Sequence, residues 1–375
     1  MKKTLVALAA LASMSAFAQS SVTLSGSVSY GQATSVANAV TYGGWKGDRN
    51  VVNIGVNEDM GNGRTAAVFL QTRFNSATGG VNTGYVRSDT GVYGGTTFEQ
   101  QKLTLTDKSL GEVSVGRFTN AMGVAPLHPF EDSAQTTSPH QAVNGRLSGQ
   151  TQYTSPSFMG VQVWALNAQA SANTYMGSGD GGGYAKALNL ASTGLEKNFG
   201  AWGVNYANGP IYAQALAYND LLGVRATKMG ASYDLGSNLY GVKLFANQFN
   251  QKNDMSFGSG TQVKTIDATT GVTTAAAAPA ASMQAHKATE LAATMPYGNF
   301  TFMAGRLTTD RSVSAANPTA DKLTKTAWGA TYSLSKRTSL QYYASTTNNP
   351  GYAASLNSAG LNTGRNQWAG VQHNF

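Results

Sequence analysis

The stretch Arg365-Asn366-Gln367-Trp368-Ala369-Gly370-Val371-Gln372-His373-Asn374-Phe375 decides the fold. One parity holds Ala369, Val371, His373 and Phe375, and the other holds Trp368, Gly370, Gln372 and Asn374. This period of two predicts a β-strand with different surroundings on its two faces. In a transmembrane barrel the last strand has to pair with the first, because an open edge in hydrocarbon leaves backbone groups unsatisfied at several kcal/mol each. We therefore expect an all-β antiparallel barrel that residues 365–375 close.

The N-terminal residues have the pattern of an export signal. Lys2 and Lys3 precede an apolar run over residues 5–12, and small residues follow up to an A-x-A site that ends at Ala18. The run is shorter than the ~20 apolar residues that a membrane-spanning helix needs. We expect residues 1–18 to be a signal peptide and residues 19–375 to form a single barrel domain.

The composition agrees with a barrel and excludes some chemistry. The formal net charge is +8, and loss of the two signal-peptide lysines leaves 8 − 2 = +6 on a chain with 12% charged residues and 43 glycines. Transmembrane strands alternate lipid-facing apolar residues with water-facing polar ones. Their mean hydropathy is therefore mildly polar and does not reveal that the protein spans a membrane. Because the chain has no cysteine, disulfides and cysteine-based metal sites are excluded.

Two kinds of connection alternate along the chain. Short turns rich in Gly, Pro, Asn and Asp are expected at 59–63, 107–111, 155–160, 208–210, 235–238, 296–299 and 334–337. Long polar loops are expected near 33–49, 75–97, 119–146, 170–199, 219–224, 250–285, 308–323 and 347–364. Seven turns and eight loops predict sixteen strands. Outer-membrane barrels have short periplasmic turns and long extracellular loops.

The first expected strands show the same alternation. Val22, Leu24, Gly26, Val28 and Tyr30 oppose Thr23, Ser25, Ser27 and Ser29, and Val52, Ile54 and Val56 oppose Asn53, Gly55 and Asn57. The apolar set is expected to face lipid or a neighbouring subunit, and the serines to face water. Aromatic residues gather near the short turns, where interfacial girdles lie: Tyr206, Tyr233, Tyr240, Phe300, Tyr332 and Phe375.

Several motifs, in their order and spacing, resemble the general-diffusion porin family of Gram-negative bacteria over the whole mature length. They are Ser21 to Gly26, Glu58 to Gly63, Gly116-Arg117, Tyr153 to Gly160, Tyr332 to Thr338 and Gly370 to Phe375. The resemblance implies a homotrimer in the outer membrane whose third long loop narrows a water-filled channel for ions and small hydrophilic solutes. It also implies contact with outer-membrane lipid and lipopolysaccharide, and a barrel-assembly machinery that reads Phe375. It implies no cofactor and no enzymatic activity.

A constriction loop is expected between Arg117 and Arg146. Prolines at 126, 129 and 139 suit an irregular path, and the carboxylates of Glu131 and Asp132 need a polar environment. Strand parity predicts that Arg73 faces the lumen, opposite to Ala66, Val68 and Leu70. The family resemblance places Arg146 on the facing wall. Arg49 and Arg117 are further candidates for the constriction.

The chain departs from the family at charged positions. Val51 and Gly55 stand where relatives often carry Arg and Lys, Glu99 stands near a usual Arg, and Gln71 replaces a usual Glu. Arg49 has the parity of Val51 and could compensate for it. The arginines together with the lost carboxylate at Gln71 predict a weak preference for anions, since opposite charges across a narrow opening set ion preference.

Other motifs carry little weight. Residues 177–182 match G-x-G-x-x-G but lie in a polar glycine-rich loop, and the four histidines have no zinc-site spacing. Lysines and arginines are spread among loops, which argues against nucleic-acid binding. Two alternatives stay open: a substrate-specific outer-membrane channel, and a barrel enzyme with a Ser/His/Asp-type site. Flux of ions and uncharged sugars distinguishes them from a general porin.

Overall fold

The computed structural model describes residues 20–35, 50–74, 98–119, 121, 129–130, 147–168, 199–219, 225–252, 262–266, 273–277, 286–311, 321–348 and 365–375. The predicted signal peptide lies outside these residues. Within them, no helix has the length and apolar character needed to cross a membrane.

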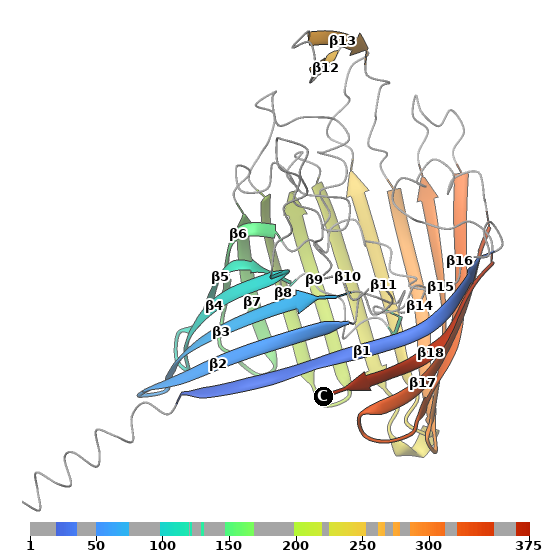
Figure 1. Cartoon of the computed structure of the whole chain (residues 1–375), viewed down its shortest axis with the longest axis horizontal. Helices are drawn as coiled ribbons and strands as arrows, with labels where there is room; N and C mark the ends of the chain where they lie inside the picture. Colours follow the sequence, from blue (N-terminus) through green and yellow to red (C-terminus); the bar gives the residue numbers. More distant parts are fainter. Residues whose placement is uncertain are drawn as a thin grey trace, which may run out of the picture.

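Sixteen antiparallel strands form one closed barrel (Figure 1). They are β1 (Ser21–Ser35), β2 (Val51–Gly61), β3 (Arg64–Arg73), β4 (Gln100–Asp107), β5 (Gly111–Phe118), β6 (Leu147–Thr154), β7 (Val161–Ala168), β8 (Phe199–Asn208), β9 (Ile211–Asn219), β10 (Arg225–Asp234), β11 (Lys243–Lys252), β14 (His286–Tyr297), β15 (Phe300–Arg311), β16 (Asp321–Ser333), β17 (Thr338–Asn348) and β18 (Arg365–Asn374). Each strand pairs with its neighbours in sequence, and β1 pairs with β18. The predicted fold class and strand number are confirmed.

The seven predicted short turns are confirmed, and they lie together along the lower edge of the barrel in Figure 1. The β2–β3 turn shows their chemistry, because Asn62 and Gly63 both have positive φ, of 52° and 76°. An Asn-Gly pair adopts this left-handed conformation at low cost. The β10–β11 turn contains the short 3-10 helix η5 (Ser237–Leu239).

Several strands extend further into the expected loops than the sequence indicated. β15 continues to Arg311 and β16 begins at Asp321, inside the loop expected over 308–323. The loop expected over 250–285 contains an additional hairpin, β12 (Gln262–Ile266) with β13 (Thr273–Ala277), which forms its own two-stranded sheet beyond the loop end of the barrel (Figure 1). The second of these strands, β13, has the sequence TTAAA and lacks the apolar alternation that marks the barrel strands.

The seam between β1 and β18 confirms that residues 365–375 close the barrel. The N–H groups of Gly26 and Phe375 each donate to the other residue's carbonyl oxygen at 3.0 Å. The aromatic ring of Phe375 covers Gly26 so closely that a Cβ atom there would lie 2.6 Å from it. Glycine at position 26 therefore leaves the space that the terminal ring occupies.

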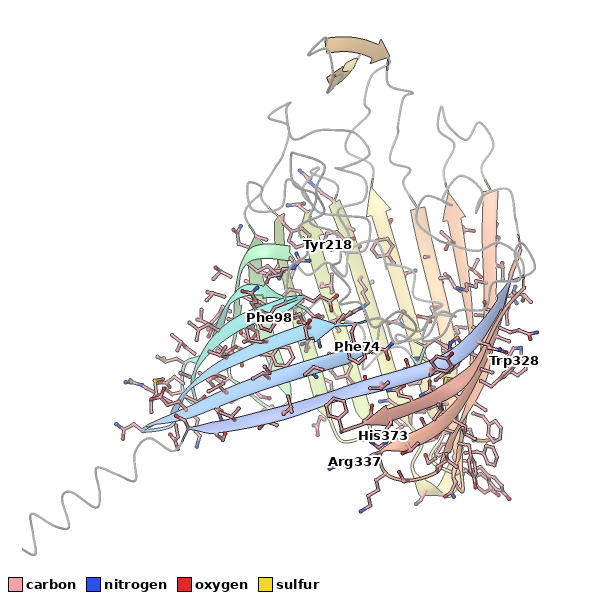
Figure 2. The ribbon with its side chains drawn as sticks, in the orientation of Figure 1. Phe74, Phe98, Tyr218, Trp328, Arg337 and His373 are labelled. Atoms are coloured by element: carbon pink, nitrogen blue, oxygen red, sulfur yellow. The ribbon has the colours of Figure 1, made fainter. Side chains whose placement is uncertain are left out.

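Inner and outer faces follow the predicted parity. Val22 and Leu24 are exposed on the outer face of β1, whereas Ser27 and Ser29 are buried on its inner face. On β18 the alternation is the same, with Trp368 buried inside and Val371 exposed outside. In Figure 2 the side chain of Trp328 lies on the outer wall, and Arg337 and His373 mark the short-turn end.

Candidate pore and its constriction

Polar side chains line part of the inner wall. Gln71 Nε2 donates to Asn53 Oδ1 at 2.8 Å, and Gln100 Nε2 donates to Gln71 Oε1 at 2.6 Å, so one ladder joins β2, β3 and β4. A similar pair, Thr104 and Ser114, joins β4 and β5 through hydroxyl groups 2.9 Å apart. A wall of this kind presents hydrogen-bonding groups inward, as a water-filled lumen requires.

Four inner-face glutamines hold the beginning of the third long loop. We call them the glutamine anchor. Gln100 Oε1 accepts from Thr119 N at 2.8 Å, Gln150 Nε2 donates to the Phe118 carbonyl at 2.6 Å, Gln152 Oε1 accepts from Ala121 N at 2.9 Å, and Gln214 Nε2 donates to the Ala121 carbonyl at 2.9 Å. These bonds satisfy backbone groups of a chain segment that leaves the sheet. Since Gln214 belongs to β9, the segment reaches well beyond the neighbouring strand β6.

Phe130 marks the second attachment of this loop. Its side chain is fully buried and packs in a cluster with Ala327, Tyr343 and Trp368, with Met303 against them. The Phe130 and Tyr343 rings meet edge to face, with centroids 6.5 Å apart. These partners lie on the inner faces of β15 to β18, far around the barrel from β9. Residues 121 and 130 are thus held on different inner walls, which confirms that the third loop enters the channel.

Arg73 faces the lumen, in agreement with its parity. It pairs in register with Val51, which in turn pairs with the buried Ser27. Its guanidinium forms an ion pair with the Glu99 carboxylate, and both side chains are largely buried. The carboxylate at position 99 therefore offsets the charge that we expected Arg73 to contribute to the pore.

Arg117 lies elsewhere than we expected. It is in register with Gln101 and shares the outward parity of Val115, beside a bulge at Gly116 where φ is +128°. Its Nε donates to the backbone carbonyl of Glu99 at 3.2 Å. Side chains alternate between the two faces along β5, so Arg117 lies on the opposite face from the inward Ser114. This corrects the expectation that Arg117 contributes to the constriction. The other predicted constriction residues, Arg49, Arg146, Glu131 and Asp132, lie outside the described residues.

Three inner-face lysines were missed at the sequence level. Lys102 on β4 places its Nζ 5.8 Å from the centroid of the Phe118 ring, a cation–π distance. Lys228 on β10 is buried in register with Leu216 and Phe249, and Lys325 on β16 is in register with Leu307. All three lie in the loop-side halves of their strands. Strand parity could have identified two of them. Lys102 alternates with the outward Leu103 and Leu105, and Lys228 is followed by the outward Met229, so both lysines have the inward parity.

One inner carboxylate lies at the level of Lys325, because Glu290 pairs with Leu307 and Leu307 pairs with Lys325. Glu290 on β14 is buried, and Asn247 Nδ2 of the adjacent strand donates to its Oε2 at 3.0 Å. In the loop-side halves, the described inner side chains thus include the cations Arg73, Lys102, Lys228 and Lys325 and the anions Glu99 and Glu290. The balance is 4 − 2 = +2. Across a narrow, partly low-dielectric opening such a balance sets ion preference.

Among the described residues, no three His, Asp or Glu side chains are grouped so that they could hold a metal ion. A closed barrel with a polar, charged inner wall and an inward loop defines a membrane-spanning channel. A family model described as Gram-negative porin matches residues 4–352, and the chain therefore belongs to the Gram-negative porin family. It is an outer-membrane channel for passive diffusion.

Solved structures share the fold at low sequence identity. An anion-selective porin from Comamonas acidovorans is 17% identical, with a TM-score of 0.57, over 95% of this chain and 100% of that one. Salmonella typhi OmpF, in a complex with daunomycin, is 12% identical with a TM-score of 0.63, over 94% and 97%. A trimer form of Vibrio cholerae OmpT is 10% identical with a TM-score of 0.56, over 95% and 99%. A search of curated protein sequences finds no match.

Proposed function

We propose that this porin conducts small inorganic ions and hydrophilic solutes with a weak preference for anions. The observation that carries the proposal is the set of inner-face lysines Lys102, Lys228 and Lys325, which exceeds the described inner carboxylates of the same zone. Few of the described inner side chains are charged, so each of these charges weighs heavily. Screening over ~8 Å at physiological salt confines their influence to the narrow zone.

Reversal potential across a KCl gradient tests this preference. We expect chloride to be favoured in the wild type, and Lys102→Gln with Lys325→Gln to shift the potential toward cation preference. Lys287→Gln is the matched control, because Lys287 is exposed on the outer face at a comparable level of the barrel. A cation-preferring wild type, or equal shifts in the control and the double variant, would contradict the proposal.

The functional unit proposed is a homotrimer. Its support is the outer face of β1 to β5, which presents exposed aliphatic side chains such as Leu24, Val68 and Leu103. The Vibrio cholerae relative with the same fold is described as a trimer form. Migration as a heat-sensitive oligomer on a denaturing gel tests this, and cross-linking solely as a monomer in mild detergent would contradict it.

The remaining expectations concern biogenesis and activity class. Removal of residues 1–18 on export is supported by the A-x-A pattern, and recognition of Phe375 by the barrel-assembly machinery is supported by its place at the seam. Mass spectrometry of the mature N-terminus tests the first. A non-enzymatic role without a cofactor is supported by family membership. Uncharged-sugar flux that saturates with one solute would instead indicate a substrate-specific channel.

A further inference from the structure

One cross-strand row on the inner wall of β1 to β5 has two large side chains between two glycines. In register from β1 to β5, the row consists of Thr23, Gly55, Phe69, Lys102 and Gly116. Phe69 and Lys102 are direct neighbours, so their Cβ atoms are about 5 Å apart. A Cβ atom added to Gly55 would meet nothing closer than 4.0 Å, apart from its neighbours in the chain. The wall is therefore open beside Phe69.

The ammonium group of Lys102 has no carboxylate partner among the described residues. Its Nζ lies 5.8 Å from the centroid of the Phe118 ring. Arg73 on the neighbouring strand differs, because its guanidinium forms an ion pair with Glu99. Lys102 is also partly exposed, so that the lumen can reach it. An ammonium group of this kind keeps hydrogen-bond donors available for an anion, and such charge-assisted bonds are strong.

Two phenyl rings lie on either side of Lys102. Phe69 is its register partner on β3, and Phe118 belongs to β5 on the other side. Phe118 is buried, whereas Phe69 is partly exposed on a wall whose next inward residue toward the loops is the polar Gln71. An accessible ring offers a flat apolar surface on which another aromatic group can pack. The row thus combines an available positive charge with an apolar surface.

Gln71 supplies a second hydrogen-bond donor on the loop side of this row. It lies two residues beyond Phe69 on β3, which puts it diagonal to Lys102 across the β3–β4 pair, at about 7–8 Å. Its Nε2 donates one hydrogen to Asn53 Oδ1 at 2.8 Å, and an amide nitrogen carries two. The other hydrogen has no acceptor among the described residues. A carboxylate placed between Lys102 and Gln71 can therefore accept from both.

We propose that this row is a binding site for small aromatic carboxylates that pass through the channel. The carboxylate accepts hydrogen bonds from Lys102 Nζ and Gln71 Nε2, and the aromatic body lies against the Phe69 ring over the open position of Gly55. The two features select the solute together, because an inorganic anion needs no ring and an uncharged aromatic solute needs no ammonium group. The inference rests on the proposed passage of small hydrophilic solutes and names one class of them.

Inhibition of the chloride current in planar bilayers tests the proposal, with benzoate, acetate and benzyl alcohol as probes at constant ionic strength. Benzoate should inhibit saturably and at about 2- to 10-fold lower concentration than acetate, because its ring adds a contact with Phe69. Benzyl alcohol, which has the ring without the charge, should not inhibit.

The charge is tested by removing it. Lys102→Gln should weaken inhibition by benzoate and by acetate about tenfold each, since a hydrogen bond to a charged group is lost. Lys243→Gln is the matched control. Lys243 is also an inner-face lysine beside a ring, with its Nζ 5.4 Å from the centroid of Phe245, but it is in register with Asp234 near the short turns. This variant should inhibit like the wild type.

The ring is tested by Phe69→Leu, which keeps an apolar side chain at this position. Benzoate should lose its advantage over acetate, while inhibition by acetate stays unchanged. Val68→Leu on the outer face of the same strand should leave the ratio of the two probes unchanged. Equal inhibition by benzoate and acetate in the wild type would overturn the proposal, and so would an unchanged ratio in Phe69→Leu or unchanged inhibition in Lys102→Gln.

Reversal potentials measured on the same samples separate this proposal from the proposed ion preference. Chloride preference without saturable inhibition by benzoate would overturn the aromatic carboxylate site alone. Cation preference together with saturable inhibition by benzoate would overturn the proposed ion preference and leave the site in place.

Discussion

Two sectors of the outer wall belong to the same barrel and have the same alternation of inward and outward side chains. They differ in the type of side chain that they expose. The aliphatic sector, the outer face of β1 to β5, exposes mainly Val and Leu side chains, and Tyr30 is its aromatic exception. The aromatic sector, the outer face of β14 to β17, exposes aromatic rings: Tyr297, Phe300 and Phe302 lie near the short turns, and Trp328 lies near the middle of β16. Aromatic girdles mark a lipid boundary. We infer that the aliphatic sector contacts protein and the aromatic sector contacts lipid.

The largest expected effect comes from placing a charge in each sector. Leu103→Arg buries an unpaired charge in a subunit contact, at a cost of about 3–5 kcal/mol, and should abolish the oligomer. Leu291→Arg on β14 faces lipid and headgroups, so it should lower the yield of folded barrel while the folded fraction stays oligomeric. Unheated gels and native mass spectrometry measure both. Identical outcomes for the two variants would remove the distinction between the sectors.

The seam at the edge of the aliphatic sector gives the next prediction. Gly26→Val introduces a Cβ within 2.6 Å of the Phe375 ring and close to a backbone carbonyl, and should destabilise closure by about 1–3 kcal/mol. Phe375→Ala removes the ring and should also reduce the folded barrel recovered from the outer membrane. Val371→Ala, on the same face, is the control. Normal recovery with altered conductance in Phe375→Ala would contradict a role in assembly.

The third loop is attached at two separate places on the inner wall, and releasing each attachment tests them. Phe130→Ala removes an aromatic side chain from the cluster on β15 to β18, which costs about 3–5 kcal/mol for a buried Phe. Gln214→Leu removes a hydrogen bond to Ala121, worth about 1 kcal/mol. Both should raise single-channel conductance, the first more strongly. Phe302→Ala on the outer face should leave it unchanged, and equal conductance in all three would contradict the loop attachments.

Much of this architecture was predictable from local sequence signals. Strand parity assigned Ser27 and Ser29 to the inside and Leu24 to the outside, and turn chemistry located Asn62-Gly63. These signals are local because the pleat repeats every two residues and a tight turn needs particular dihedrals. Local signals did not locate the strand ends as well, because β15 and β16 continue through polar residues of the kind that is common in loops.

The site was harder to predict because it depends on contacts between distant strands. The ion pair between Arg73 and Glu99 joins residues on different segments, and no local pattern shows that the two charges offset each other. Arg117 was assigned from the family pattern, although its register with Gln101 puts it outside. Lys102 was within reach of the parity argument. Phe130 was not, because the cluster that buries it comes from β15 to β18.

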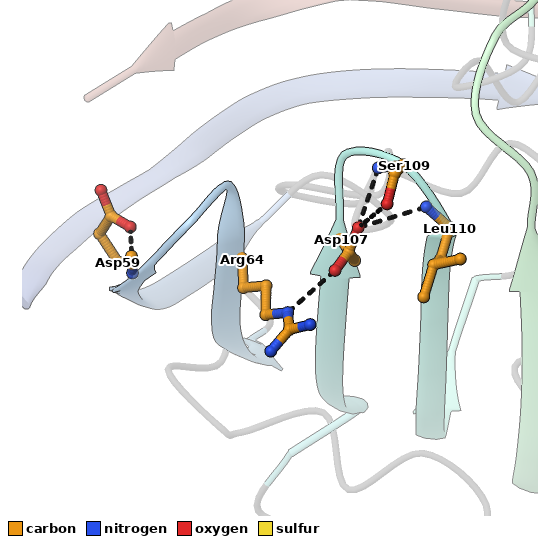
Figure 3. A network of polar contacts seen from close by, with 6 residues as sticks. Asp59, Arg64, Asp107, Ser109 and Leu110 are labelled. Atoms are coloured by element: carbon orange, nitrogen blue, oxygen red, sulfur yellow. Dashed lines mark hydrogen bonds and ion pairs between the residues drawn. The ribbon is translucent and has the colours of Figure 1, made fainter.

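The smallest expected effect lies at the lower edge of the aliphatic sector. There Asp107 accepts hydrogen bonds from the Ser109 hydroxyl at 2.6 Å and from Arg64 Nε at 2.9 Å, beside the capped turn at Asp59 (Figure 3). The Ser109 hydroxyl, followed by Arg64, holds the pKa of Asp107 well below its usual range. The aromatic sector has stacked rings at its edge instead, with Phe300 and Phe302 centroids 5.6 Å apart.

A lowered carboxyl pKa gives a stabilising contribution that is complete above its unfolded value, about 4, and is lost as pH falls through the folded value. Asp107→Asn should therefore slightly lower the unfolding temperature at pH 7 and have a smaller effect near pH 2. Asp310→Asn, an exposed carboxylate at the loop end, is the control. A larger effect of Asp107→Asn in acid than at neutral pH would contradict this account of the turn.

The division of the outer wall into two sectors underlies the proposed oligomer, and one measurement tests it most directly. Because the chain has no cysteine, single cysteines at Leu103 and Leu291 can each carry a fluorophore without interference. Quenching by brominated lipid in reconstituted bilayers then reports lipid contact at each position. The account predicts strong quenching at position 291 and weak quenching at position 103. Strong quenching at position 103 in the intact oligomer would contradict it.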